Sequence, residues 1–344
     1  MSNLDHAAAM ALPEERLAEY LQMALPGFHG PLRAEKFKGG QSNPTYKLDA
    51  RNGRYVLRRK PPGQLLPSAH AVDREFRVLR ALHGGAVPVA RPLHLCTDES
   101  VIGSMFYVME FVVGRVFWDP ALTDTPPATR RPIFEAMVDT LAAIHAVDVD
   151  AVGLADFGKP GNYFARQLAR WSEQYRASGT GLVPALDTLM AELERRCPAD
   201  DGLVALVHGD YRIDNLMFDD VAPKVRAVVD WELSTLGHPL ADLGYLCMAL
   251  RLPRNPVLPG LGGLDRGALA VPDEAEMLAR YTALTGRALP ADWPFVLAFS
   301  FFRLAAIAHG VAVRAQQGNA SSEQARRTGM MTALLAELGL QALA

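Results

Sequence analysis

The sequence contains little of what a metal-binding or disulfide-rich protein needs. It has three cysteines among 344 residues (Cys96, Cys197 and Cys247), and no two of them form a CxxC pair. Its nine histidines show neither an HExxH nor an HxH pattern, so the sequence predicts no zinc site. An odd number of scattered cysteines is typical of reduced thiols, and we therefore expect a cytoplasmic protein.

Runs of like charge and long apolar runs are also missing. Lys and Arg total 35 and Asp and Glu total 38, a net charge of −3, so the sequence predicts neither a nucleic-acid partner nor a membrane surface. Residues 1–12 hold no Lys or Arg, and their apolar stretch is too short for a secretory signal. The most hydrophobic window, residues 295–313, is interrupted by Arg303 and His309, which favours a buried core helix over a membrane span.

The remaining pattern divides the chain into a strand-rich first third and a helical remainder. Asn52-Gly53 predicts a tight hairpin turn between strands 45–50 and 54–59. Ser68 is a candidate cap for a helix whose Val72, Phe76 and Leu79 form one apolar stripe. The other expected elements are helix 13–25, strands 91–95 and 102–112, helices 133–147, 163–175, 186–193, 239–250, 274–284, 293–313 and 322–338, and a strand pair formed by 204–207 with 225–229. The irregular Pro/Gly-rich segment 253–267 is a candidate lid.

One octet carries the chemistry. Residues 208–215 read His-Gly-Asp-Tyr-Arg-Ile-Asp-Asn, with the HxDxxxxN spacing of a kinase catalytic loop. Fifteen residues after Asn215, Asp230 ends the next apolar strand, and pairing of the two strands would place Asn215 beside Asp230. Phosphoryl transfer needs such a set: Asp210 to accept the proton of the acceptor hydroxyl, and a carboxylate with an amide oxygen to hold Mg²⁺.

Together with the motifs around it, the octet resembles the aminoglycoside phosphotransferase superfamily, and most closely the phosphotransferase domain found fused to acyl-CoA dehydrogenases. The resemblance runs from about residue 37 to the last helix and rests on the segments 39–46, 55–58, 208–215, 230–232 and 237–243. It implies an α+β, protein-kinase-like fold of two lobes. The expected divisions are a nucleotide-binding lobe of residues 1–109, a hinge at 110–114, and a helical lobe of 115–344 with the acceptor pocket.

The resemblance also implies how ATP and Mg²⁺ are bound. The loop with Gly39, Gly40, Ser42 and Asn43 would cover the phosphates, since glycines let backbone N–H groups approach phosphate oxygens. Arg58, standing where kinases carry a lysine, would clamp the phosphates with Glu75 as its partner. Arg59 and Lys60 remain competing candidates for the clamp. Glu110 lies in the strand that leads to the hinge, and Asn215 and Asp230 are the expected metal ligands.

Other residues of the resemblance have expected supporting roles. Asp242 resembles the aspartate that braces the catalytic loop from a helix start, and His208 is expected to support the geometry of that loop. His145 lies on an apolar stripe and is expected to be a core histidine rather than a ligand.

The predicted function is an ATP- and Mg²⁺-dependent kinase of a small-molecule hydroxyl group. Alternatives are an aminoglycoside or choline-type kinase, a nucleotide-binding scaffold without turnover, and a protein kinase. The last is disfavoured because Asp230-Trp231-Glu232 stands where protein kinases have DFG. Residues 251–344 hold nine arginines and no lysine against seven acids, and Arg303 and Arg314 need anionic partners. The bland alternative is that an internal carboxylate such as Asp242 pairs these arginines. Taken with the resemblance to the domain fused to acyl-CoA dehydrogenases, the balance favours an anionic hydroxylated acceptor, and the resemblance suggests a hydroxyacyl-CoA. The nucleotide base and the oligomeric state stay open.

Overall fold

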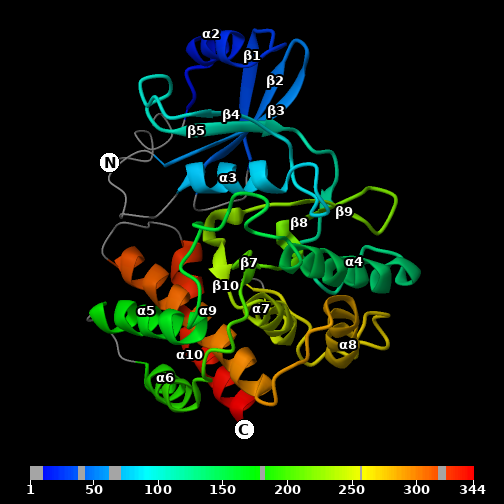
Figure 1. The fold of residues 1–344 in the computed structure, drawn as a ribbon, viewed down its shortest axis with the longest axis vertical. Helices are drawn as coiled ribbons and strands as arrows, with labels where there is room; N and C mark the ends of the chain where they lie inside the picture. Colours follow the sequence, from blue (N-terminus) through cyan, green and yellow to red (C-terminus); the bar gives the residue numbers. More distant parts are fainter. Residues whose placement is uncertain (1–10, 38–42, 62–70, 179–182, 256–257, 317–322) are drawn as a thin grey trace. The chain divides into compact units, whose positions relative to one another are not determined.

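A computed structural model describes residues 11–37, 43–61, 71–178, 183–255, 258–316 and 323–344, and only the backbone of 314–316 and 323–328 (Figure 1). The chain forms two compact units, which we name unit 1 (Met1–Arg115 and Met217–Leu233) and unit 2 (Val116–Leu216 and Ser234–Ala344). Residues 217–233 therefore group with the N-terminal unit, whereas the sequence-based division placed them in the lobe 115–344.

Unit 1 is built on an antiparallel five-stranded sheet. Its strands are β1 (Leu32–Lys36), β2 (Thr45–Ala50), β3 (Gly53–Arg59), β4 (Pro92–Cys96) and β5 (Phe106–Glu110), in the order β1-β2-β3-β5-β4. The β2–β3 hairpin turns at Arg51-Asn52, and Gly53, with a φ of 153°, is the first residue of β3 and pairs with Ala50. Helix α2 (Glu14–Ala24) buries Leu17 and Leu21 in the core of this unit, together with the apolar face of the sheet. The hairpin is present as predicted, but its turn lies one residue before Asn52-Gly53, and Asn52 does not have a positive φ.

The second segment of unit 1 returns to helix α3 (Val72–Leu82). After β8 (Leu216–Phe218) and β9 (Val225–Val228), the short 3₁₀ turn η2 (Trp231–Leu233) packs against α3. The Val228 N–H donates to the Pro88 carbonyl at 2.9 Å, and the buried Trp231 indole donates to the Val228 carbonyl at 3.0 Å. These contacts fix the backbone on both sides of Asp230.

Unit 2 is mainly helical. Its helices are α4 (Pro127–His145), α5 (Tyr163–Ala177), α6 (Pro184–Arg196), α7 (Leu240–Arg251), α8 (Glu274–Thr285), α9 (Trp293–Gln316) and α10 (Glu323–Leu343). The apolar helix α9 contacts α5, α6, α7 and α10 (Figure 1). Among the described residues, α9 is the one helix long and apolar enough to cross a membrane. However, 78% of the apolar window of its segment Trp293–Val313 is buried inside the structure. This burial fits the core-helix interpretation of residues 295–313.

Several sequence-based boundaries differ from the structure. Strand β7 (Ala205–Val207) pairs with β10 (Thr235–Gly237), so the predicted pairing of 204–207 with 225–229 is wrong. Strand β9 instead joins a three-stranded sheet of order β6-β8-β9, with β6 at Arg115–Val116. Strand β1 was not anticipated, because its charged sequence Leu-Arg-Ala-Glu-Lys has one buried residue and so little apolar alternation. The N-cap of α3 is Ala71, not Ser68, and Ser68 lies outside the described residues.

The candidate lid, residues 253–267, is attached to the C-terminal end of α7. The Leu261 N–H donates to the Leu250 carbonyl at 2.9 Å and the Gly262 N–H to the Leu252 carbonyl at 2.8 Å. A side chain at Gly260 could not fit, since an added Cβ would lie 2.0 Å from the Leu252 carbonyl oxygen. Outside residues 256–257, which are not described, this segment is packed rather than detached.

Candidate active site

The octet lies in unit 2 as a loop that leaves strand β7 and ends in the 3₁₀ turn η1 (Ile213–Asn215). A buried tyrosine anchors this loop: Tyr211 is fully buried, and its hydroxyl donates to the Met137 carbonyl of α4 at 2.7 Å. The loop backbone next to Asp210 is thereby fixed.

Asp242, in the first turn of α7, braces this loop. It is completely buried and accepts the His208 N–H at 2.6 Å and the Gly209 N–H at 2.8 Å. Burial opposes the ionisation of Asp242, but hydrogen bonds from His145 and Gly209 outweigh burial and hold its pKa below the usual value. The predicted bracing role of Asp242 is confirmed.

His145 completes the support under the loop. Its Nε2 lies 3.4 Å from Asp242 Oδ2 and its Nδ1 lies 2.7 Å from the Tyr281 hydroxyl. Burial lowers the pKa of His145, so the neutral ring donates through Nε2 to the carboxylate and accepts from Tyr281. The expectation that His145 is a core group is confirmed by its burial.

Asp210 itself contacts Asn215 and Arg212. The Asn215 amide nitrogen donates to the Asp210 carbonyl at 2.8 Å and to its Oδ2 at 3.0 Å, and Arg212 Nε lies 3.4 Å from Oδ1. Burial favours the neutral acid, but Arg212 and the Tyr245 hydroxyl reverse that effect, and the pKa of Asp210 is lowered. The carboxylate is ionised at neutral pH and its contacts fix its rotamer.

Arg303 of α9 acts on the same loop. It is buried, donates to the Gly209 carbonyl, and lies with its guanidinium 5.0 Å from the centre of the Tyr245 ring. It also lowers the pKa of Asp210 through its charge. Arg303 is therefore bound to the backbone of the octet loop and lies near the Asp210 charge, so it gives no support for an anionic acceptor. Arg314, the other arginine of that argument, has a side chain outside the described residues.

Unit 1 contains a second polar cluster, centred on Arg58 of β3. Arg58 Nε lies 2.9 Å from Glu75 Oε2, and its Nη2 contacts Asp230 and lies 3.6 Å from Glu232 Oε2. One guanidinium therefore faces three carboxyl groups. Asp230 is held with a φ of 66°, a left-handed conformation that is costly for a residue other than glycine and typical of functional sites.

Glu75 of α3 is the buried end of this cluster, with 1% of its surface exposed. It accepts the Asn43 amide at 2.8 Å and the Tyr107 hydroxyl at 3.2 Å in addition to Arg58. Burial raises the pKa of Glu75, and the Arg58 guanidinium opposes that effect. The three carboxyl groups in turn raise the pKa of Arg58 despite its own burial, so Arg58 stays charged.

The structure separates Arg58 from Arg59 as candidates for the phosphate clamp, and Lys60 stays a candidate. Arg59 is buried away from the cluster and donates to the Ser104 hydroxyl at 2.9 Å. Alternation along β3 explains this result, since neighbouring side chains of a strand point to opposite faces. The structure thus brings Arg58 and Glu75 together, as predicted.

The structure describes some of the other candidate nucleotide-binding residues and not others. Asn43 is buried, and its amide is used by Glu75 and Glu232 within the cluster. The Glu110 carboxylate accepts the Arg91 N–H at 2.9 Å, and its own N–H donates to the Arg91 carbonyl. Gly39, Gly40 and Ser42 lie outside the described residues. Of the two expected metal ligands, Asn215 belongs to unit 2 and Asp230 to unit 1.

The sequence analysis did not predict that two further residues contact the candidate site residues. Glu232 completes the Arg58 cluster, and its place two residues after Asp230 was a usable signal. Tyr245 hydrogen-bonds Asp210, but nothing in its sequence context distinguishes it from the other apolar positions of α7.

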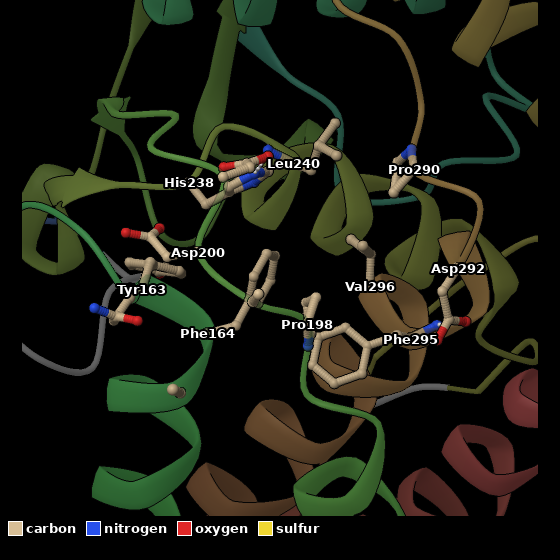
Figure 2. A pocket seen from close by; sticks show the side chains of 14 residues that line it. Tyr163, Phe164, Pro198, Asp200, His238, Leu240, Pro290, Asp292, Phe295 and Val296 are labelled. Atoms are coloured by element: carbon tan, nitrogen blue, oxygen red, sulfur yellow. Dashed lines mark hydrogen bonds and ion pairs between the residues drawn. The ribbon is translucent and has the colours of Figure 1, made fainter.

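Unit 2 also has a cavity of about 90 Å³ between the starts of α5, α7 and α9 (Figure 2). The rings of Tyr163, Phe164 and Phe295 form its apolar surface, and His238 hydrogen-bonds Asp201 at 3.1 Å at its edge. No residue of the octet lines this cavity, so we assign it no part in the chemistry of the loop.

The comparisons identify the family. The model of the phosphotransferase enzyme family matches residues 33–279, more than half of the chain. The chain belongs to this family. A candidate aminoglycoside phosphotransferase of Ralstonia eutropha is 48% identical, with a TM-score of 0.87 over 97% of this chain and 98% of that one. The aminoglycoside phosphotransferase APH(4)-Ia, solved with ADP and hygromycin B, has 14% identity and a TM-score of 0.64 over 96% and 99% of the two chains, which shows the shared fold.

Two relatives of this phosphotransferase family member are longer proteins. Acyl-CoA dehydrogenase family member 10 of Mus musculus is 45% identical over 96% of this chain, and family member 11 of Rattus norvegicus is 43% identical over 94%. The chain spans 31% and 42% of those proteins, respectively. The predicted fold class, an α+β kinase-like fold of two lobes, and the predicted resemblance are both confirmed.

Proposed function

We propose that this phosphotransferase transfers the γ-phosphoryl group of ATP to a hydroxyl of a small molecule, with Mg²⁺. The observation that carries the proposal is the Asp210 carboxylate, ionised and held by Asn215 on a loop braced by Asp242. A scaffold without turnover would have no need to hold a partly exposed, ionised carboxylate on such a loop.

In this mechanism Asp210 accepts the proton of the acceptor hydroxyl while the hydroxyl oxygen forms its bond to the γ-phosphorus and the bond to ADP breaks. Because Asn215 Nδ2 donates to Asp210, its amide oxygen is the atom left for a cation. That oxygen and the partly exposed Asp230 carboxylate are hard ligands that fit Mg²⁺. Bound Mg²⁺ would neutralise charge on the phosphates, and Arg58, fixed by Glu75, would bind them.

For the acceptor we propose a hydroxyacyl-CoA in a cytoplasmic setting. The support is the likeness to acyl-CoA dehydrogenase family members, whose name refers to acyl-CoA chemistry. Arg303 no longer contributes to this choice because it is bound to the catalytic loop. An aminoglycoside acceptor is the second candidate, favoured by the likeness to the Ralstonia eutropha protein.

The test is a steady-state assay of ADP formation with Mg-ATP and either a hydroxyacyl-CoA or kanamycin. We expect phosphorylation of the hydroxyacyl-CoA and little of kanamycin. Asp210→Asn should lower kcat by about 10²–10⁴-fold and leave nucleotide binding intact. Phosphorylation of kanamycin alone would refute the acceptor, and full turnover by the Asn variant would refute the role of Asp210.

A further inference from the structure

Arg58 lies between the expected metal ligand Asp230 and the other carboxyl groups of its cluster. Its Nε lies 2.9 Å from Glu75 Oε2, while its Nη2 contacts Asp230 Oδ1 and lies 3.6 Å from Glu232 Oε2. All four residues belong to unit 1. The two ends of one guanidinium therefore face different partners within a single compact unit.

The end of Arg58 that faces Glu75 is fixed. The Glu75 side chain is 2% exposed, and it also accepts the Asn43 amide at 2.8 Å and the Tyr107 hydroxyl at 3.2 Å. Moving Arg58 away would leave this buried carboxylate without its cation, which is strongly destabilising. Arg58 therefore keeps its contact with Glu75 when a ligand binds nearby.

The other end of Arg58 has two acceptors within reach. The Asp230 side chain is 30% exposed and that of Glu232 is 19% exposed, so solutes can approach this end from the solvent. A small shift of Nη2 from Asp230 toward Glu232 would replace one charge-assisted hydrogen bond by another. Glu232 is thus an alternative partner for Nη2 when Asp230 is bound to something else.

Asp230 cannot pair with Arg58 and bind a divalent cation equally well. The contacts of Val228 and Trp231 fix its backbone on both sides, so its carboxylate stays beside the guanidinium. A divalent cation on that carboxylate would lie close to Arg58, and like charges repel strongly where water is partly excluded. A polyphosphate removes the conflict, because its oxygens attract both the guanidinium and the metal ion.

We propose that Arg58 closes the Asp230 metal site until a nucleotide binds. The proposal rests on the proposed function and describes the regulation of the same site. Without nucleotide, Nη2 holds Asp230, and divalent cations bind there weakly. When the polyphosphate binds, Nη2 turns to its oxygens or to Glu232, and Asp230 is released to the metal ion. Metal and nucleotide therefore bind with positive coupling, and each raises the affinity for the other by the same factor.

The experiment measures the binding of Mn²⁺ to the full chain without nucleotide, by electron paramagnetic resonance of the free ion. Arg58→Gln should bind Mn²⁺ at least about fivefold more tightly than the wild type, the lower end of typical coupling between sites. Arg59→Gln is the matched control. It removes the same charge from the next position of β3, where the arginine is bound to Ser104, and should keep the wild-type affinity.

A second measurement tests the effect of the nucleotide. The affinity for AMP-PNP is determined by calorimetry with saturating Mn²⁺ and again in EDTA, and the ratio of the two affinities gives the coupling. In Arg58→Gln this ratio should fall by the factor by which the affinity for Mn²⁺ alone rises, since Asp230 is already released.

Two further variants protect the test against unfolding and assign the site. Arg58→Gln leaves the buried Glu75 without its cation, so the double variant Arg58→Gln/Glu75→Gln, whose two amides can hydrogen-bond each other, is measured beside it. The double variant should show the same gain in Mn²⁺ affinity. Adding Asp230→Asn to either variant should remove the gain, because the released ligand is then absent.

Equal Mn²⁺ affinities of the wild type and both Arg58 variants would overturn the proposal. An equal gain in Arg59→Gln, or a gain that survives Asp230→Asn, would also overturn it. The proposed function fails separately: the expected gain, with no phosphoryl transfer by the wild type to either acceptor, would refute the function and retain the closure by Arg58. Turnover of an acceptor together with equal Mn²⁺ affinities would retain the function and overturn the closure.

Discussion

Replacing Asp242 by Asn tests whether a buried carboxylate holds the catalytic loop. The Asp242 oxygens accept the backbone N–H groups of His208 and Gly209 at 2.6 and 2.8 Å. An Asn side chain has one acceptor oxygen, so one of these N–H groups would face an amide NH₂ instead. The loss of a charge-assisted bond and the unsatisfied buried donor together cost about 3 kcal/mol. For a unit of about 150–250 residues, such as unit 2, that corresponds to a fall in Tm of roughly 6–12 °C.

The assay is differential scanning calorimetry of the wild type and the Asn variant at several pH values. Because the pKa of Asp242 is below its usual value, the stability that its ionised form contributes is present above the unfolded pKa of about 3.9 and is lost as the pH falls. The difference in Tm should therefore be largest near neutral pH and shrink below about pH 4.

Asp124→Asn, at an exposed aspartate of the same unit, is the matched control and should leave Tm unchanged. The same Asp242 variant should also lose kcat, since the loop carries Asp210. A Tm equal to that of the wild type at pH 7 would refute the bracing role of Asp242 and the magnitude above.

Three more outcomes are expected. Asp230→Ala should weaken ATP binding in Mg²⁺ far more than in EDTA, and equal calorimetric affinities for wild type and variant in Mg²⁺ would count against a metal role. The effects of Arg58→Gln and Glu75→Gln on ATP affinity should be non-additive, because the two side chains are in contact. Independent effects in the double-mutant cycle would show that Glu75 takes no part in ATP binding. Arg303→Met should raise the pKa of Asp210, so the acidic limb of the kcat/KM profile should move to higher pH, and an unshifted limb would disprove that electrostatic contribution.

Some of the fold was determined by short stretches of sequence. The Asn-Gly signal predicted strand 45–50 with its observed ends, although the turn itself lies at Arg51-Asn52, and the apolar periodicity predicted α8 within one residue. The octet was correctly expected on a loop after an apolar strand. These features depend on turn geometry and on the 3.6-residue period of a helix, so neighbouring residues suffice to specify them.

Only the tertiary structure decided which distant groups meet. Strand β7 pairs with β10 rather than with 225–229, and Arg303 reaches Gly209, 94 positions away, instead of an acceptor. Asn43 likewise donates to Glu75 of α3. A buried polar group takes whichever partner the packing of other segments brings within about 3 Å, and its own sequence neighbourhood does not record that choice. The sequence therefore determined which residues could do the chemistry, and packing determined which of them hold the loop and which remain to meet a substrate.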